Sequence, residues 1–204
     1  MFSRFSRFVP SAVAAFLVSA GVGAVACDAA HMRAVYPETA VPVDPRLATV
    51  VFVRPRLAPA VVNFTVVDVA NDGAARFLGE SPPTSHFAVA VAPGEHTFVA
   101  WGGGHEDAVR ATLAPGRVYF VAVRSALFRP LMLRAVRRSG DDAEDAARWV
   151  ADTTALAPDR EAGQRDLVKD PRNLEQHLAD AMGSLHGLDG DELAERTLGP
   201  DDAQ

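Results

Sequence analysis

The chain has 204 residues, of which 49% are hydrophobic and 23% are charged, with 20 basic side chains, 26 acidic side chains and one cysteine. This composition excludes wholesale disorder, a collagen-like repeat and a disulfide-rich mini-protein. The length is sufficient for one domain of about 100–150 residues with extensions, and such a domain can bury a core without metal ions or disulfides.

The first 26 residues have the organisation of a secretory signal peptide. Arg4 and Arg7 are the only charges of this segment, and an apolar stretch follows that ends in Ala24-Val25-Ala26. Because the stretch is shorter than the roughly 20 residues of a membrane-spanning helix and contains glycine and serine, we expect it to be removed on export.

The only cysteine, Cys27, comes directly after this segment. Small residues followed by cysteine resemble the lipobox of bacterial lipoproteins, although Ala24 stands where that motif usually has leucine. The resemblance implies that Cys27 is acylated, for example with palmitate, and anchors the protein to the inner or outer membrane of the cell envelope. The alternative is ordinary cleavage after Ala26, which would release a protein with an unpaired thiol at Cys27.

After the cysteine, residues 27–46 predict an extended tether, because the segment is rich in proline toward its end. Eight strands are expected next: Ala48–Arg54, Val62–Val69, Ala75–Glu80, His86–Val91, Glu95–Trp101, Ala108–Leu113, Arg117–Arg124 and Leu131–Arg138. Short strands separated by turn residues predict a mainly β fold, a sandwich of about eight short antiparallel strands over residues 47–138.

Two segments of this region have similar sequences. Pro93–Ala100 and Pro115–Ala122 are identical at five of eight positions, and each begins with a Pro-Gly turn followed by an alternating aromatic strand. We interpret them as two successive hairpins of one meander. With these motifs, the stretch Leu47–Arg138 resembles the small PEGA-like β-sandwich domains of a bacterial lipoprotein family. The resemblance implies an envelope β-sandwich and carries no site residues.

Residues 139–204 predict an acidic helical tail. Helices are expected over Asp141–Leu156 and from Pro171 to about His186, with a short third helix over Asp191–Leu198. Residues 159–169 are interpreted as a linker with some helical turns, and residues 199–204 as a frayed end. The second helix has one apolar face, formed by Leu174, Leu178, Ala181, Met182 and Leu185.

Charge is distributed unevenly between the two regions. Residues 44–138 have 11 basic and 7 acidic side chains, a net charge of +4, whereas residues 139–204 have 6 basic and 17 acidic side chains, a net charge of −11. We therefore expect the tail helices to cover the sheet region, because amphipathic helices usually bury their apolar face in their own domain. Docking of the helices on a partner protein is the alternative.

The histidines do not form a metal-binding motif. None of the six shows a ligand spacing typical of zinc sites, and the pair that could approach most closely is His86 and His96, across a hairpin centred on Pro93-Gly94. We expect no metal and no other cofactor. No nucleophile, nucleotide or phosphate-loop motif is present either, so we expect no catalytic residues and a protein that is not an enzyme.

One loop is a candidate ligand site. Trp101, His105, Glu106 and Asp107 lie around Gly102-Gly103-Gly104 and could form the rim of a site for a glycan or small ligand, with the indole as a stacking surface. The alternative is a tryptophan that belongs to the core.

These observations lead to two functional hypotheses. The first is a non-enzymatic, lipid-anchored cell-envelope protein that acts as a structural or protein-interaction module, with the membrane and an envelope protein as partners. The second is a periplasmic small-ligand or glycan-binding domain that uses the rim Trp101–Asp107. The net negative charge argues against nucleic acid as a partner.

Overall fold

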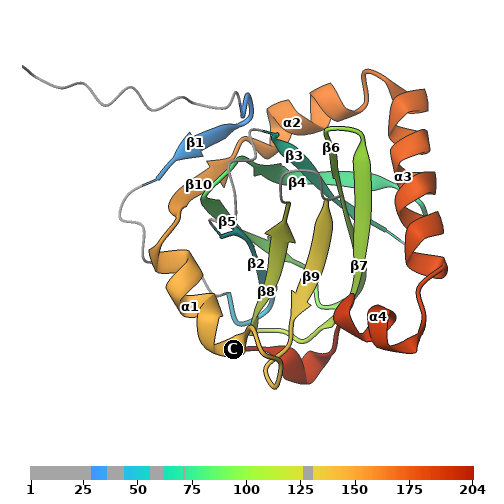
Figure 1. Ribbon diagram of the computed structural model, residues 1–204. Coiled ribbons are helices and arrows are strands. Elements are labelled where there is room, and N and C mark those ends of the chain that lie inside the picture. Colours follow the sequence, from blue (N-terminus) through green and yellow to red (C-terminus); the bar gives the residue numbers. More distant parts are fainter. Residues whose placement is uncertain (1–28, 36–43, 56–61, 71, 126–130) are drawn as a thin grey trace, which may run out of the picture.

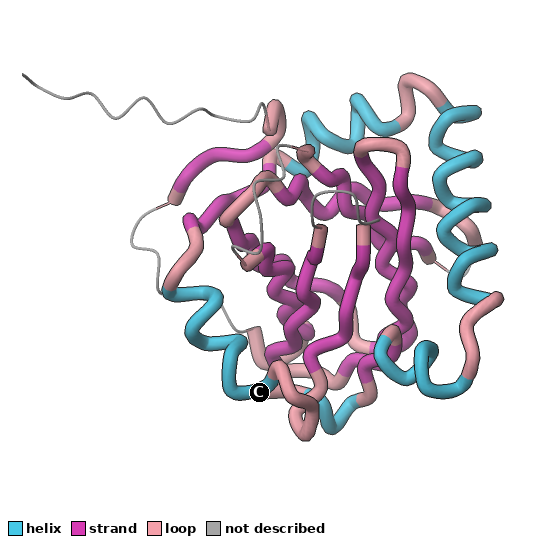
Figure 2. The backbone as a smooth tube through the Cα atoms, viewed as in Figure 1, coloured by secondary structure: helices cyan, strands magenta, loops and turns pink. Residues whose placement is uncertain are grey.

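The structure is a computed structural model that describes residues 29–35, 44–55, 62–70, 72–125 and 131–204. Over these residues it is mainly β, with two mixed sheets that pack as a sandwich, and α-helices from the tail (Figures 1 and 2). The predicted fold class is therefore confirmed. The signal segment and Cys27 lie outside the described residues. Within the described part, no helix has the length and apolar character needed to cross a membrane.

The first sheet, sheet A, has six strands in the order β1, β10, β5, β2, β8, β9. Their bounds are Met32–Ala34 (β1), Thr154–Pro158 (β10), Ser85–Val91 (β5), Ala48–Arg54 (β2), Val118–Arg124 (β8) and Met132–Val136 (β9). The β2 strand is buried along its whole length, as its continuous β-branched sequence predicts. Its neighbour β8 runs parallel to it, whereas β5 runs antiparallel.

The second sheet, sheet B, has five strands in the order β11, β7, β6, β3, β4. Their bounds are Thr197–Leu198 (β11), His105–Leu113 (β7), Gly94–Gly102 (β6), Phe64–Val69 (β3) and Ala75–Ser81 (β4). The four long strands are antiparallel to their neighbours, and β11 adds to β7 in parallel.

The main core lies between the inner faces of the two sheets. Phe52 and Phe87 of sheet A stack with ring centroids 5.1 Å apart, and Phe98 of sheet B meets Phe52 edge-on at 5.4 Å. All three rings are almost fully buried. Alternation along each strand then turns the remaining side chains to the outer faces, which the helices cover.

Helices enclose the sandwich on both sides, as Figure 2 shows. The four helices are Ala143–Ala151 (α1), Arg160–Leu167 (α2), Pro171–His186 (α3) and Gly190–Glu195 (α4). On sheet A, Ala146 of α1 packs against Ala122 and Val136. On sheet B, Ala181 and Leu185 of α3 pack in a second cluster with residues of β3, β6 and β7. The prediction that the apolar face of this helix packs on its own domain is confirmed.

The tail also supplies parts of both sheets, which the sequence analysis did not predict. The expected first helix ends at Ala151, because residues 154–158 leave it and pair with β5 as β10. Strand β1, within the expected tether, pairs in turn with β10. Residues 139–204 therefore do not form a unit separate from the sandwich.

The expectation of a frayed segment at residues 199–204 is wrong. Residues Pro200–Asp202 form a 3₁₀ helix, and Ala203 is 4% exposed within the main core. The buried Tyr119 hydroxyl donates a hydrogen bond to the carbonyl of Pro200 at 3.0 Å, and the amide of Gln204 donates to Val118. These contacts with sheet A explain why the segment is ordered.

The interpretation of the similar segments Pro93–Ala100 and Pro115–Ala122 as two hairpins of one meander is also wrong. Pro93-Gly94 carries the chain from β5 in sheet A to β6 in sheet B, and Pro115-Gly116 returns it from β7 to β8. Both glycines have positive φ, 124° for Gly94 and 67° for Gly116. The repeated sequence therefore marks two similar turns that cross between the sheets.

Opposite charges join the two regions, as their net charges suggest. Arg124 and Arg134 of sheet A bind the carboxylate of Asp142, at 2.7 and 3.3 Å, and Arg134 also binds Glu195 of α4 at 3.3 Å. The partners of these arginines in the described structure are thus acids of the tail.

Candidate functional site

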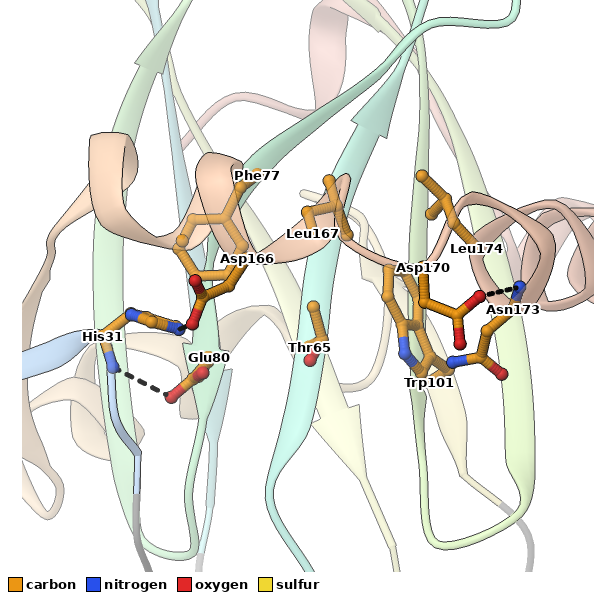
Figure 3. Close-up of a pocket in the computed structure, with 11 residues that line it drawn as sticks. His31, Thr65, Phe77, Glu80, Trp101, Asp166, Leu167, Asp170, Asn173 and Leu174 are labelled. Carbon is orange, nitrogen blue, oxygen red and sulfur yellow. Dashed lines mark hydrogen bonds and ion pairs between the residues drawn. The ribbon is translucent and has the colours of Figure 1, made fainter.

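A cleft of about 230 Å³ lies between the outer face of sheet B and helices α2 and α3 (Figure 3). Its lining comes from the N-terminal segment, from three adjacent strands and from both helices. The lining residues are His31, Thr65, Phe77, Glu80, Trp101, Gly163, Asp166, Leu167, Asp170, Asn173 and Leu174.

The floor of the cleft is a row of side chains set by strand register. Thr65 of β3 is the direct partner of Glu80 on β4 and of Trp101 on β6, and Trp101 is in turn the partner of Glu106 on β7. Side chains of directly opposite residues point to the same face of a sheet. A carboxylate, a hydroxyl and an indole therefore lie side by side across three strands, at a spacing of about 4.8 Å per strand.

A β-bulge in β4 places the side chains of Phe77 and Glu80 on the same face of sheet B. Simple alternation would put Phe77 and Glu80, three residues apart, on opposite faces. The register shifts between Val66 and Val67 of the partner strand, so that Phe77 opposes Val67 while Glu80 opposes Thr65. Both Phe77 and Glu80 then face the helices and line the cleft.

Glu80 is 8% exposed, and the partners of its carboxylate among the described residues are neutral. The amide nitrogen Nδ2 of Asn63 donates to Oε2 at 3.2 Å, and the backbone amide of His31 donates to the same oxygen at 3.5 Å. No arginine or lysine of the described residues forms an ion pair with it, and its Oε1 accepts no hydrogen bond from them. Glu80 is thus a buried acid at the floor of the cleft without a cationic partner in this part of the chain.

One end of the cleft is closed by the segment that precedes β1. The Nε2 of His31 lies 3.2 Å from Oδ2 of Asp166 on α2, and the His31 ring meets the Phe77 ring edge-on at 5.8 Å. The Nζ of Lys169 lies 2.6 Å from the other oxygen of Asp166, and this neighbouring ammonium lowers the pKa of that carboxyl. Asp166 therefore already has a cationic partner in Lys169, in contrast to Glu80.

Trp101 lies at the other end of the cleft. The ring of His177, from α3, stacks on the indole at 5.1 Å, and the Nδ1 of His177 lies 2.8 Å from Oε1 of Glu106. Asp170 and Asn173 lie beside the indole in Figure 3, and the Asp170 side chain accepts a hydrogen bond from the backbone amide of Asn173 at the start of α3. The uncovered part of the indole faces the cleft with these polar groups.

Helix α2 is held over the cleft by the edge of sheet B. Gln164 accepts a hydrogen bond from the amide of Phe77 at 2.7 Å and donates one to the carbonyl of Ala75 at 3.1 Å, so that it satisfies two backbone groups of the edge strand β4. Gly163 lies directly on the Phe77 ring, where a Cβ atom would have no room.

The four residues of the predicted rim do not stay together. Trp101 lines the cleft and Glu106 holds His177 beside it, whereas His105 is exposed at the first position of β7. Asp107 points to the opposite face, between the sheets, because neighbouring strand residues alternate. There it lies 3.2 Å from the guanidinium of Arg196. Burial raises the pKa of Asp107, and the charge of Arg196 opposes this shift.

The histidine pair considered for metal binding is also separated. His86 lies on β5 in sheet A, where Nδ1 contacts the Thr153 hydroxyl at 2.8 Å, whereas His96 lies on β6 in sheet B beside Asp68. Two strands joined by a sheet-crossing turn cannot bring these rings together. Within the described ranges, no group of three or more histidine, cysteine, aspartate or glutamate side chains is arranged to hold a metal ion.

Sequence reasoning found Trp101 and missed most of its neighbours. Thr65 and Glu80 are linked to Trp101 only through strand register, Asp166 lies in the segment interpreted as a linker, and His31 lies in the expected tether. His177 is not part of the apolar face of its helix, and no ligand spacing singles it out.

No family model matches the chain, and no curated protein matches it. The resemblance of residues 47–138 to PEGA-like lipoprotein domains therefore stays a prediction.

Proposed function

We propose that this chain is a non-enzymatic, lipid-anchored protein of the bacterial cell envelope that binds a small polar ligand in the cleft beneath α2 and α3. The observation that carries the proposal is the cleft floor, where Glu80, Thr65 and Trp101 lie in one row. Binding sites for small polar molecules typically combine an apolar or aromatic surface with a few converging polar groups. The cleft favours ligand binding over the hypothesis of a purely structural module, because it is a concave surface with this combination.

The size of the cleft limits the ligand. At about 230 Å³ it lies below the roughly 300 Å³ at which pockets for drug-sized molecules begin, so it fits a ligand of one ring or a short chain. The export and membrane anchoring in this proposal rest on the sequence around Cys27.

Ligand binding can be tested with the two tryptophans of the chain, Trp101 and Trp149. Trp149 lies on α1, on the opposite side of the sandwich, so the variant Trp149→Phe leaves Trp101 as the only indole. We expect the fluorescence of this variant to respond to members of a panel of monosaccharides and short amines. The matched variant Trp101→Phe should not respond. If no compound changes the Trp101 signal at millimolar concentration, ligand binding in the cleft is refuted.

The anchor has a separate test. Cells that express the protein are labelled with an alkyne fatty acid, and wild type is compared with Cys27→Ser. We expect label on the wild type only. Absence of label on the wild type would refute acylation and leave the cleft proposal standing.

A further inference from the structure

The ligand of the cleft can be specified further from the charge at its floor. Glu80, Asp166 and Asp170 all line it. Asp166 is paired with His31 and Lys169, whereas buried Glu80 has two neutral donors and no described cationic partner. Burying a carboxylate without a cation is unfavourable, and a bound cation would offset that cost. The cleft therefore favours a positively charged ligand.

We infer that the cleft binds a primary ammonium group carried by a small polar body, with the ammonium between Glu80 and Thr65 and the body against Trp101. This inference rests on the proposed function, since it names the ligand class of the same cleft. Amino sugars and the ethanolamine headgroup of a phospholipid both carry such a group.

The acceptors beside Glu80 favour a primary ammonium over other cations. A primary ammonium donates three hydrogen bonds, and the floor offers the free Oε1 of Glu80 and, directly opposite, the hydroxyl of Thr65. A quaternary ammonium cannot donate, and its usual site is a cage of several aromatic rings around one point. Here Phe77 and Trp101 lie at opposite ends of the cleft, so they do not form such a cage (Figure 3).

The spacing of Glu80, Thr65 and Trp101 determines the size of the ligand body that carries the ammonium group. Glu80 and Trp101 are separated by one strand, so their Cα atoms are about 10 Å apart at the usual strand spacing. A ligand with its ammonium at Glu80 and one ring, or a short chain of similar length, reaches the indole. Asn173 and Asp170, beside the indole, supply an amide and a carboxylate for hydroxyl groups of that body.

The test compares three sugars of the same ring with the Trp149→Phe variant as reporter. Glucosamine carries a primary ammonium, glucose carries a hydroxyl at that position, and N-acetylglucosamine carries a neutral amide. We expect glucosamine to bind at least about tenfold more tightly than either neutral sugar, because hydrogen bonds to charged groups are the stronger ones. If a neutral sugar binds as well as glucosamine, the ammonium inference is refuted and the proposed cleft function stands. If none of the three sugars and no amine below binds, both are refuted.

A second arm separates the two sources of the ammonium. Ethanolamine and vesicles of phosphatidylglycerol with or without phosphatidylethanolamine are titrated in the same assay. Binding of glucosamine alone assigns the cleft to amino sugars, and binding of ethanolamine together with the phosphatidylethanolamine vesicles assigns it to the lipid headgroup. Either outcome supports the ammonium inference, whereas binding of vesicles regardless of phosphatidylethanolamine contradicts it.

The role of the carboxylate is tested by Glu80→Gln, with Asp166→Asn as the matched control. Both variants remove one charge from the cleft, but Asp166 is already paired with His31 and Lys169. We expect Glu80→Gln to weaken glucosamine binding about 10- to 100-fold and to abolish the preference over glucose, with a much smaller effect for Asp166→Asn. Equal effects would overturn the assignment. Should Glu80→Gln fail to fold, loss of wild-type binding at a pH where the glucosamine amine is neutral provides the same test, and unchanged binding there refutes the inference.

Discussion

Helix α2 contains a glycine whose replacement by alanine should destabilise the protein, against the usual trend. Gly163 lies in the middle of the helix, where alanine is normally favoured over glycine by about 1 kcal/mol. A Cβ at this position would overlap three carbons of the Phe77 ring. Because Phe77 is 3% exposed, the ring cannot swing into solvent to make room.

The size of the effect follows from these two opposed contributions. Forcing an extra carbon into a packed site costs about 1–3 kcal/mol, so Gly163→Ala should lower the free energy of unfolding by about 0–2 kcal/mol after the helix gain. Gly183, exposed on α3, is the matched control, because an added Cβ there meets nothing within 4 Å. Gly183→Ala should raise stability by about 0.5–1 kcal/mol.

The assay is urea unfolding followed by far-ultraviolet circular dichroism. The helix contribution is shared by both substitutions, so the difference between the variants isolates the overlap with Phe77, about 1–3 kcal/mol. At a slope of about 2 kcal/mol per molar urea this separates the midpoints by about 0.5–1.5 M. Equal stabilisation by Gly163→Ala and Gly183→Ala would show that α2 does not sit on Phe77, and would remove one wall of the cleft.

Two further predictions concern buried charges. Both ring nitrogens of His96 face acceptors, with Nδ1 3.0 Å from the Asp68 carboxylate and Nε2 2.7 Å from a backbone carbonyl, and the hydrogen bond to Asp68 raises the pKa of His96. Its contribution to stability is therefore full below about pH 6.5, the unfolded value, and is lost as the pH rises through the folded pKa. Urea midpoints between pH 6 and 9 should fall more steeply for wild type than for His96→Gln, and parallel profiles would contradict this. Arg196→Met leaves the buried Asp107 without its cation and should lower the free energy of unfolding by about 3–5 kcal/mol, and adding Asp107→Asn should recover part of that loss. Arg165→Met removes one partner of an exposed ion pair and should lower it by at most about 0.5 kcal/mol. Similar urea midpoints for the two arginine variants would refute the assignment of Asp107 as a buried, paired acid.

The strands could be predicted where their signal is local. Ala48–Arg54 was expected with its observed bounds, because a run of β-branched residues of strand length is itself the signal. Thr154–Pro158 carries no such signal, since it is short and contains two alanines. It is a strand because β5 offers an edge to pair with, 69 residues earlier in the chain. Pairing of this kind depends on the folded sheet and cannot be inferred from the segment alone.

The same distinction applies to the cleft. Trp101 could be singled out by its residue type beside a glycine-rich turn. The position of Glu80 beside it depends on the register of three strands and on a bulge at Val66 and Val67, neither of which leaves a pattern in the local sequence. The contact of His31 with Asp166 joins positions 135 residues apart, so only the complete fold reveals it.

The strands and contacts contributed by residues 154–204 also determine when the domain can fold. β10 separates β1 from β5 in one sheet, β11 extends the other, and Leu198 and Ala203 fill the core between them. No earlier part of the chain can therefore complete either sheet while these residues are still being synthesised. Non-local pairing of this type makes folding slow, because distant segments must meet before their contacts are stabilising. If the chain is exported as we propose, we expect late completion of the core to favour an unfolded polypeptide during export, so that the cleft forms after the chain has crossed the membrane.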